Sequence, residues 1–148
     1  MGRRPGTMEG VTDINDIPGH GDPATTMVLL AAAIRERLDR LPQPAVHPAL
    51  RSASVQVLDA CGALTPGEGP PPGFVEVADR FANNFDDDAA VWPMDDVNFA
   101  VELAAANLAV VAAQWANDRP DPDGDPWAKQ VSAVRGGLRR LDDVLGSP

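Results

Sequence analysis

Three carboxylates at alternating positions, Asp121, Asp123 and Asp125 in the sequence DPDGD, are the residues most suited to holding a metal ion. Carboxylate oxygens are the hard ligands that Ca²⁺ prefers. A complete calcium site also needs further oxygen ligands beyond the turn. The residues that follow therefore decide between a metal site and a plain turn.

Over these five residues the chain resembles the start of an EF-hand calcium loop. The resemblance ends at Pro126, which stands where the loop requires a turn glycine, and at Ser132, which replaces the closing glutamate. Asp and Gly are also the ordinary residues of turns and helix caps. We interpret the segment as a capped turn and predict no metal site.

A second acidic group comprises Asp86, Asp87, Asp88, Asp95 and Asp96. Aspartates can hold Mg²⁺ against a diphosphate, but such a site also needs other ligands and a basic clamp. The rest of the chain offers neither. We interpret the group as a solvated acidic surface, in which Asp95 caps the helix that follows.

The chain contains one cysteine and two histidines as candidates for a nucleophile or a general base. Cys61 is the single cysteine, which excludes an intrachain disulfide and indicates a reducing, cytoplasmic location. It falls on the apolar face of a predicted helix, where a thiol usually packs as a small hydrophobe. His20 and His47 lie in loops, and no Glu-x-x-His pair exists for a di-metal bundle. We predict no catalytic residue and no cofactor.

The negative charge is concentrated in one segment. The formal net charge is -10, and residues 76–126 hold twelve acids against two bases. Such a field repels nucleic acid and anionic membranes and attracts basic protein surfaces. The alternative is that the charge only keeps the protein soluble.

Residues 95–117 are the stretch around which the fold is expected to form. Between Leu103 and Ala113 only Asn107 is polar, without Gly or Pro, which indicates a buried helix. Glu102 and Asn107 lie on nearly opposite faces, so no continuous polar stripe exists. We therefore expect both to be buried polar residues with partners inside the protein.

Proline marks the starts of the predicted helices. It lacks a backbone N–H, but an N–H in the first turn of a helix has no acceptor within that helix. It stands at or just before five helical patterns, at residues 23, 48, 72, 93 and 126. The predicted helices cover 23–41, 48–63, a third from about 72, 95–117 and 126–145. We predict an all-α, up-and-down bundle of four main helices plus one short helix around 95–117. Residues 1–21 form a flexible tail and 22–146 a single domain.

The last helix has the most regular apolar spacing. Trp127, Val131, Val134, Leu138, Leu141 and Leu145 alternate steps of four and three, as in a coiled-coil seam. Gly136 and Gly137 interrupt it, which indicates a kink or a close approach of another backbone. The seam offers a surface for a homodimer.

Three functions follow from these patterns. The first is an interaction module, such as an adaptor or an immunity or antitoxin-like protein, that binds a basic protein through the aspartates named above. The second is a small-molecule-binding bundle or minor enzyme with a pocket beside the central helix. The third is a homo-oligomer assembled through the last helix.

Overall fold

The computed structural model describes residues 14, 17, 22–42, 45–84, 95–118, 121 and 123–146. Four of its five helices begin at a proline or an aspartate. Every predicted helix is present, although the third begins at Phe74 rather than near Pro72. The five helices are α1 (Pro23–Arg40), α2 (Pro48–Gly62), α3 (Phe74–Asn84), α4 (Asp96–Asp118) and α5 (Asp125–Gly146).

Side chains cap the first two helices. Asp22 precedes α1. Its Oδ2 accepts hydrogen bonds from the backbone amide of Thr25 at 3.1 Å and from the Thr25 hydroxyl at 2.8 Å. His47 precedes α2, and its Nδ1 accepts from the amide of Ala49 at 3.1 Å. α5 begins at Asp125 itself, directly before Pro126. Its carboxylate lies in the first turn, where the helix dipole still favours it.

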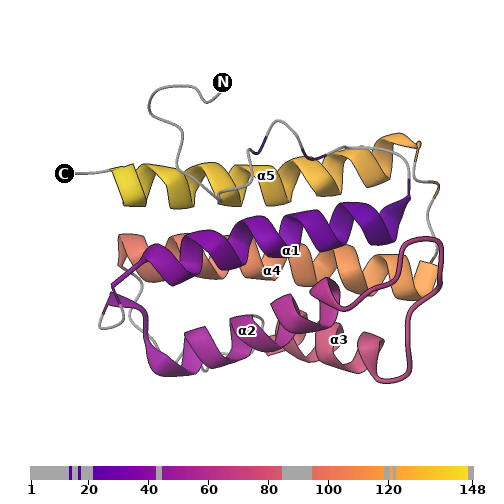
Figure 1. Ribbon diagram of the computed structural model, residues 1–148, viewed down its shortest axis with the longest axis horizontal. Coiled ribbons are helices and arrows are strands. Elements are labelled where there is room, and N and C mark those ends of the chain that lie inside the picture. The colour runs from indigo at the N-terminus through magenta and orange to yellow at the C-terminus, as the bar shows by residue number, and fades with distance from the viewer. Residues whose placement is uncertain are drawn as a thin grey trace, which may run out of the picture.

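The chain direction alternates from helix to helix, and the helices lie nearly parallel to one long axis (Figure 1). α4 packs against each of the other four helices, most extensively against α5. The all-α, up-and-down bundle around the central helix is therefore confirmed.

The core consists largely of small and branched aliphatic side chains. Leu108, Val131 and Leu138 are fully buried between α4 and α5. Aromatic residues contribute at two places: Trp127 is fully buried, and the rings of Phe74 and Trp115 meet edge to face with centroids 5.6 Å apart. The many alanines of α4 let the neighbouring helices approach closely.

The closest approach is at Gly137 of α5. A Cβ built on this glycine would lie 2.6 Å from the Cα of Ala104 in α4, so the two backbones touch where neither residue carries a large side chain. Of the two alternatives predicted for the glycine pair, close approach is correct at Gly137. Gly136 is exposed, and a Cβ there would meet nothing within 4 Å.

The seam of α5 faces inward. Trp127, Val131, Val134, Leu138 and Leu141 are all 0% exposed. Because α4 already covers these side chains, the surface on which the homodimer prediction was based is unavailable to a second copy of the folded chain.

α4 is enclosed on most sides but not on all. Leu103 and Asn107 are half-buried, and Val110 is 40% exposed. The expectation that this helix has no face in solvent is therefore wrong along one stripe. By length and composition α4 is also the one described helix that could cross a membrane, and 56% of its most apolar window is buried inside the bundle.

Two residues before α1 join the core. Ile17 is 1% exposed and Ile14 is 8% exposed, and a guanidinium nitrogen of Arg135 donates a hydrogen bond to the carbonyl of Ile17. At these two positions of the predicted tail over 1–21, the side chains bury apolar surface against the bundle. The rest of that segment lies outside the described residues.

Candidate functional site

Acidic residues gather at one end of the bundle, where α1 and α5 begin, α4 ends and the loop after α2 turns back (Figure 1). We call this the acidic end. It comprises Asp22, Glu68, Asp118, Asp121, Asp123 and Asp125, all of which are exposed. No ion pair joins any of these six carboxylates to a lysine or arginine of the described chain.

Asp22 ties the loop after α2 to the start of α1. Its Oδ2 accepts a third hydrogen bond from the amide of Gly67 at 3.1 Å, and Gly67 has a φ of 84°, which glycine adopts without strain. Slight burial raises the pKa of Asp22, but the hydrogen bonds from Thr25, Gly67 and Ala24 outweigh it and hold the pKa below its ordinary value. The Asp22 carboxylate therefore stabilises the fold in addition to carrying part of the negative charge of the acidic end.

The turn between α4 and α5 holds the alternating aspartates. Asp121 organises it: its Oδ1 accepts from the amide of Asp123 at 3.0 Å, and its carbonyl accepts from the amide of Gly124 at 2.9 Å. Within the described chain no three His, Cys, Asp or Glu side chains are grouped closely enough to hold a metal ion. The geometry is that of a hydrogen-bonded turn with outward-facing carboxylates.

Two members of the second acidic group, Asp95 and Asp96, lie at the opposite end. Asp95 caps α4 as predicted, accepting hydrogen bonds from the amide of Asn98 at 2.8 Å and its Nδ2 at 2.9 Å, and Asp96 is exposed in the first turn. Asp86, Asp87 and Asp88 lie outside the described residues. α4 has 23 residues and so separates its two ends by ~34 Å. The length of this helix therefore holds Asp95 and Asp96 apart from the acidic end.

Arginines brace this opposite end, which we call the arginine end and define by Arg37, Arg51 and Arg140. Arg37 of α1 is 2% exposed, and its Nε lies 2.7 Å from Oδ1 of Asp142 in α5. Its Nη2 donates to Oδ2 of the same carboxylate at 3.4 Å, and its Nη1 to the carbonyl of Ala33 at 3.0 Å. A buried guanidinium with these partners joins the first and last helices.

The other two arginines also cross between helices. Arg51 of α2 donates from Nη2 to the carbonyl of Leu38 in α1 at 3.3 Å. The guanidinium of Arg140 in α5 lies 5.1 Å from the centre of the Phe99 ring in α4, a cation–π contact. These contacts and the Arg37–Asp142 pair link α1, α2, α4 and α5 through charged side chains.

Asn98 is the polar residue that α4 actually buries. It is 2% exposed, and its Oδ1 accepts from the amide of His47 at 2.9 Å, which connects α4 to the start of α2. Glu102 and Asn107 are only half-buried, so the prediction of burial is wrong for both. The internal partner expected for Asn107 is present, because its Nδ2 donates to the carbonyl of Ala133 at 3.3 Å.

Cys61 is not a reactive thiol. It is 1% exposed on the inner face of α2, and burial raises its pKa to about 12. A thiol with such a pKa holds almost no thiolate near neutral pH. The prediction that it packs as a hydrophobe is confirmed.

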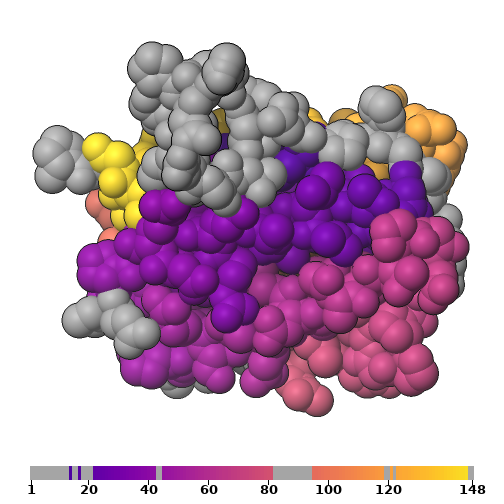
Figure 2. Space-filling model, in the orientation of Figure 1, coloured from indigo at the N-terminus to yellow at the C-terminus, as the bar shows by residue number. Residues whose placement is uncertain are grey.

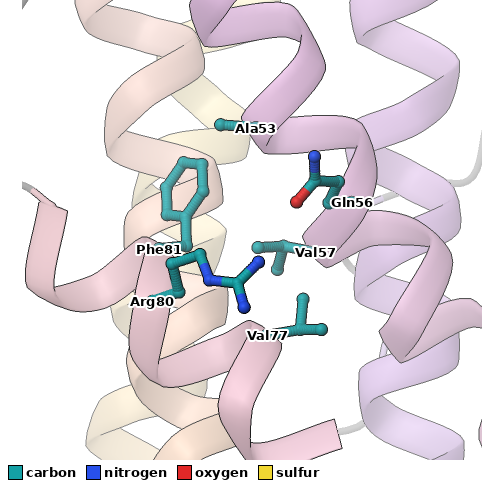
Figure 3. A pocket seen from close by; sticks show the side chains of 6 residues that line it. All are labelled: Ala53, Gln56, Val57, Val77, Arg80 and Phe81. Atoms are coloured by element: carbon teal, nitrogen blue, oxygen red, sulfur yellow. The ribbon is translucent and has the colours of Figure 1, made fainter. Parts of the chain in front are cut away.

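Two hollows lie among the first three helices. The smaller, of about 20 Å³, lies between α2 and α3, where the Arg80 side chain runs beside Phe81 and Val57 (Figure 3). The larger, an open groove of about 490 Å³, lies between α1 and α2.

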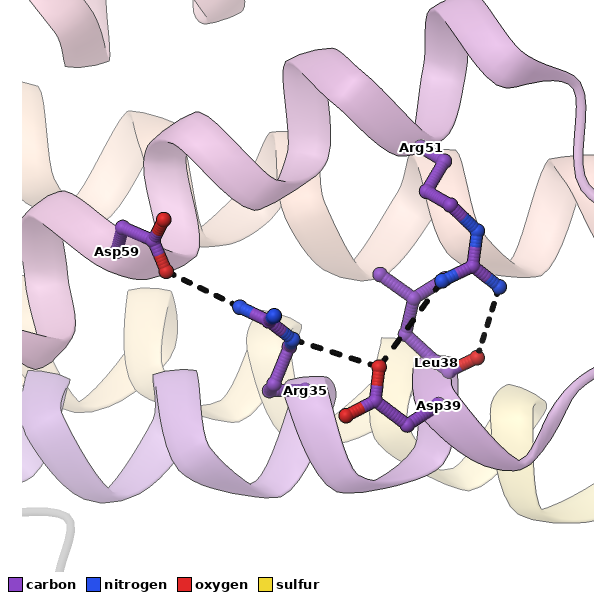
Figure 4. A network of polar contacts seen from close by, with 5 residues as sticks. All are labelled: Arg35, Leu38, Asp39, Arg51 and Asp59. Atoms are coloured by element: carbon purple, nitrogen blue, oxygen red, sulfur yellow. Dashed lines mark hydrogen bonds and ion pairs between the residues drawn. The ribbon is translucent and has the colours of Figure 1, made fainter.

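Ion pairs flank the larger groove (Figure 4). Arg35 of α1 reaches Asp59 of α2, with Nη1 3.0 Å from Oδ1, and its Nε lies 3.4 Å from Oδ1 of Asp39. Two carboxylates therefore share the positive charge of Arg35 at the edge of the groove.

Sequence reasoning missed the burial of Arg37 and Asn98, although weak signals existed for each. Arg37 follows Leu30 by seven residues and Ile34 by three, which places it on the apolar stripe of its helix. Asn98 follows Asp95 by three residues, the spacing of an N-cap and its partner. Neither signal identifies Asp142 or His47 as the partner.

No protein-family model, curated protein or solved structure matches the chain.

Proposed function

We propose that this protein is an interaction module that binds a basic surface of another protein through its acidic end. The observation that carries this proposal is the set of six exposed carboxylates with no cation partner in the described chain. Such a field raises the rate of encounter with a basic partner and disfavours nucleic acid and anionic membranes.

Helix stability explains only part of this charge. Asp22 and Asp125 lie at the starts of α1 and α5, where a carboxylate complements the helix dipole. Asp118 lies in the last turn of α4, where the dipole opposes it, and Asp123 accepts no hydrogen bond within the described chain. A binding role accounts for these two aspartates, which the fold itself does not need.

Salt provides the first test. The full chain, purified from its native cells with an affinity tag, is expected to retain a basic protein at low ionic strength and release it as salt is raised, because exposed charges are screened beyond about 8 Å at physiological salt. Failure to retain any basic protein, or retention that ignores salt, contradicts the proposal.

A further inference from the structure

The groove between α1 and α2 has the size and shape of a site for a helical segment. About 490 Å³ of space is open there, because the residues that line it are mostly small. Ala31 and Ala32 line it from α1, and Gly62 and Ala63 from α2. Val28 is half-buried and supplies apolar surface, whereas Leu58 is 3% exposed. The hollow between α2 and α3, at about 20 Å³, admits no more than a water molecule.

The two ends of the groove differ. Its lining on α1 runs from Val28 to Arg35, which is ~10 Å of helix, or about two turns. The ion pair between Arg35 and Asp59 lies at its far end. At the near end, α1 begins and α2 runs into the loop whose Gly67 amide bonds Asp22. The near end of the groove therefore lies at the acidic end, and the two helices that form the groove lie on the side of the molecule that faces the viewer in Figure 2.

Charge selects the occupant. An anionic ligand would need a free cation, but the guanidinium of Arg35 is already shared by Asp39 and Asp59. A basic ligand finds Asp22 and Glu68 at the near end, both exposed and neither ion-paired within the described chain. Two turns of apolar lining match side chains at positions i, i+3 or i+4, and i+7 of a helix.

We infer that the groove receives an amphipathic basic helix of the partner, with its apolar face between α1 and α2 and its lysines or arginines at the acidic end. This inference rests on the proposed function and names the chemistry of its partner. Apolar contacts in the groove then supply affinity, while the carboxylates supply orientation and rate.

The test uses a model helix and a matched pair of variants. The probe is a leucine–lysine peptide of about 18 residues, long enough to be helical, with leucines at i, i+3, i+4 and i+7; its control has the same composition with leucines on all faces. Ala32→Glu places a larger side chain in the groove, and Val110→Glu adds the same charge on an exposed face of α4. Both variants add negative charge, so electrostatics alone would tighten peptide binding to each.

Calorimetry on the full chain is expected to show the amphipathic peptide binding at least about tenfold more tightly than its control. Ala32→Glu is expected to weaken binding about tenfold, and Val110→Glu to leave it unchanged or tighter. Equal binding by the two peptides, no binding by either, or an Ala32→Glu variant that binds like the unaltered chain overturns the inference.

A third variant separates this inference from the proposed function. If Asp118→Asn with Asp123→Asn weakens peptide binding while Ala32→Glu does not, the acidic end is the binding surface and the groove is not. If Ala32→Glu weakens binding and the aspartate variant does not, the groove binds but the proposed role of the acidic end fails. Thermal melts show that each variant is folded before it is titrated.

Discussion

Arg37, Arg51 and Arg140 each contact a neighbouring helix at the arginine end, whereas Asp118 and Asp123 at the acidic end contact no cation of the described chain. A charged side chain that is paired with a neighbour stabilises the fold. Removing it leaves the neighbour's charge buried without a partner, which is energetically costly. A charge without a partner adds little to stability and stays available to another molecule. Substitutions at the two ends should therefore have opposite consequences.

The largest effect is expected at Arg37. Arg37→Ala removes the guanidinium that joins α1 to α5, and we expect the free energy of unfolding to fall by about 3 kcal/mol, at the lower limit for a broken buried pair because Asp142 is partly exposed. Urea denaturation measures this loss. Arg139→Ala is the control, since Arg139 is exposed on α5 and should change stability by less than about 0.5 kcal/mol. Similar losses in both variants would contradict the assignment of Arg37 as a brace.

The second largest loss of stability is expected at Asn98. Asn98→Ala leaves the amide of His47 without its acceptor in a mostly buried place, and we expect a loss of about 2 kcal/mol in urea denaturation. Asn107→Ala is the matched control, because Asn107 is half-buried and makes one long hydrogen bond, so about 0.5 kcal/mol is expected. A larger loss at Asn107 would show that the buried polar contact is misassigned.

A smaller effect is expected at the structural carboxylate of the acidic end. Asp22→Ala removes the cap of α1 and should cost about 1 kcal/mol at neutral pH. Because the folded protein lowers the pKa of Asp22, its contribution is present above the ordinary value of 3.8 and is lost as pH falls through the folded pKa.

Thermal melts between neutral and strongly acidic pH measure this dependence. Asp22→Asn retains a capping oxygen but cannot titrate, so its stability should match that of the unaltered chain below the folded pKa of Asp22. It should fall progressively behind as the pH rises from the folded pKa to the ordinary value of 3.8, and the difference should then stay constant. A stability difference between the two that grows as the pH is lowered would contradict the account.

The smallest effect on stability is expected where the proposal places binding. Asp118→Asn with Asp123→Asn should change the free energy of unfolding by less than about 0.5 kcal/mol, with a slight gain because Asp118 opposes the dipole of α4. Thermal denaturation checks this. A loss greater than about 1 kcal/mol would show that these aspartates hold the fold together.

Local patterns predicted most of the fold. Proline starts α1 and α2, the apolar spacing of α5 marks its buried face, and Gly137 marks a close contact. Each of these depends on neighbours in sequence or on the period of a helix, which the residues themselves carry.

Contacts between residues far apart in the sequence could not be predicted. Arg37 and Asp142 are 105 positions apart, and no periodicity links an arginine on one helix to an aspartate on another. The groove arises because small residues of α1 and α2 face each other, which depends on how the two helices are rotated. The separation of the acidic groups was accessible in principle, because the length of α4 sets the distance between its ends.

The most direct test of the contrast between the two ends compares equal losses of charge at each. Asp118→Asn with Asp123→Asn removes two exposed carboxylates from the acidic end, and Asp96→Asn with Asp143→Asn removes two from the arginine end. The dissociation constant of the retained basic partner should rise about tenfold for the first variant and stay within about twofold for the second. Equal weakening by both variants would contradict the account, because net charge alone, and not the acidic end, would then explain binding.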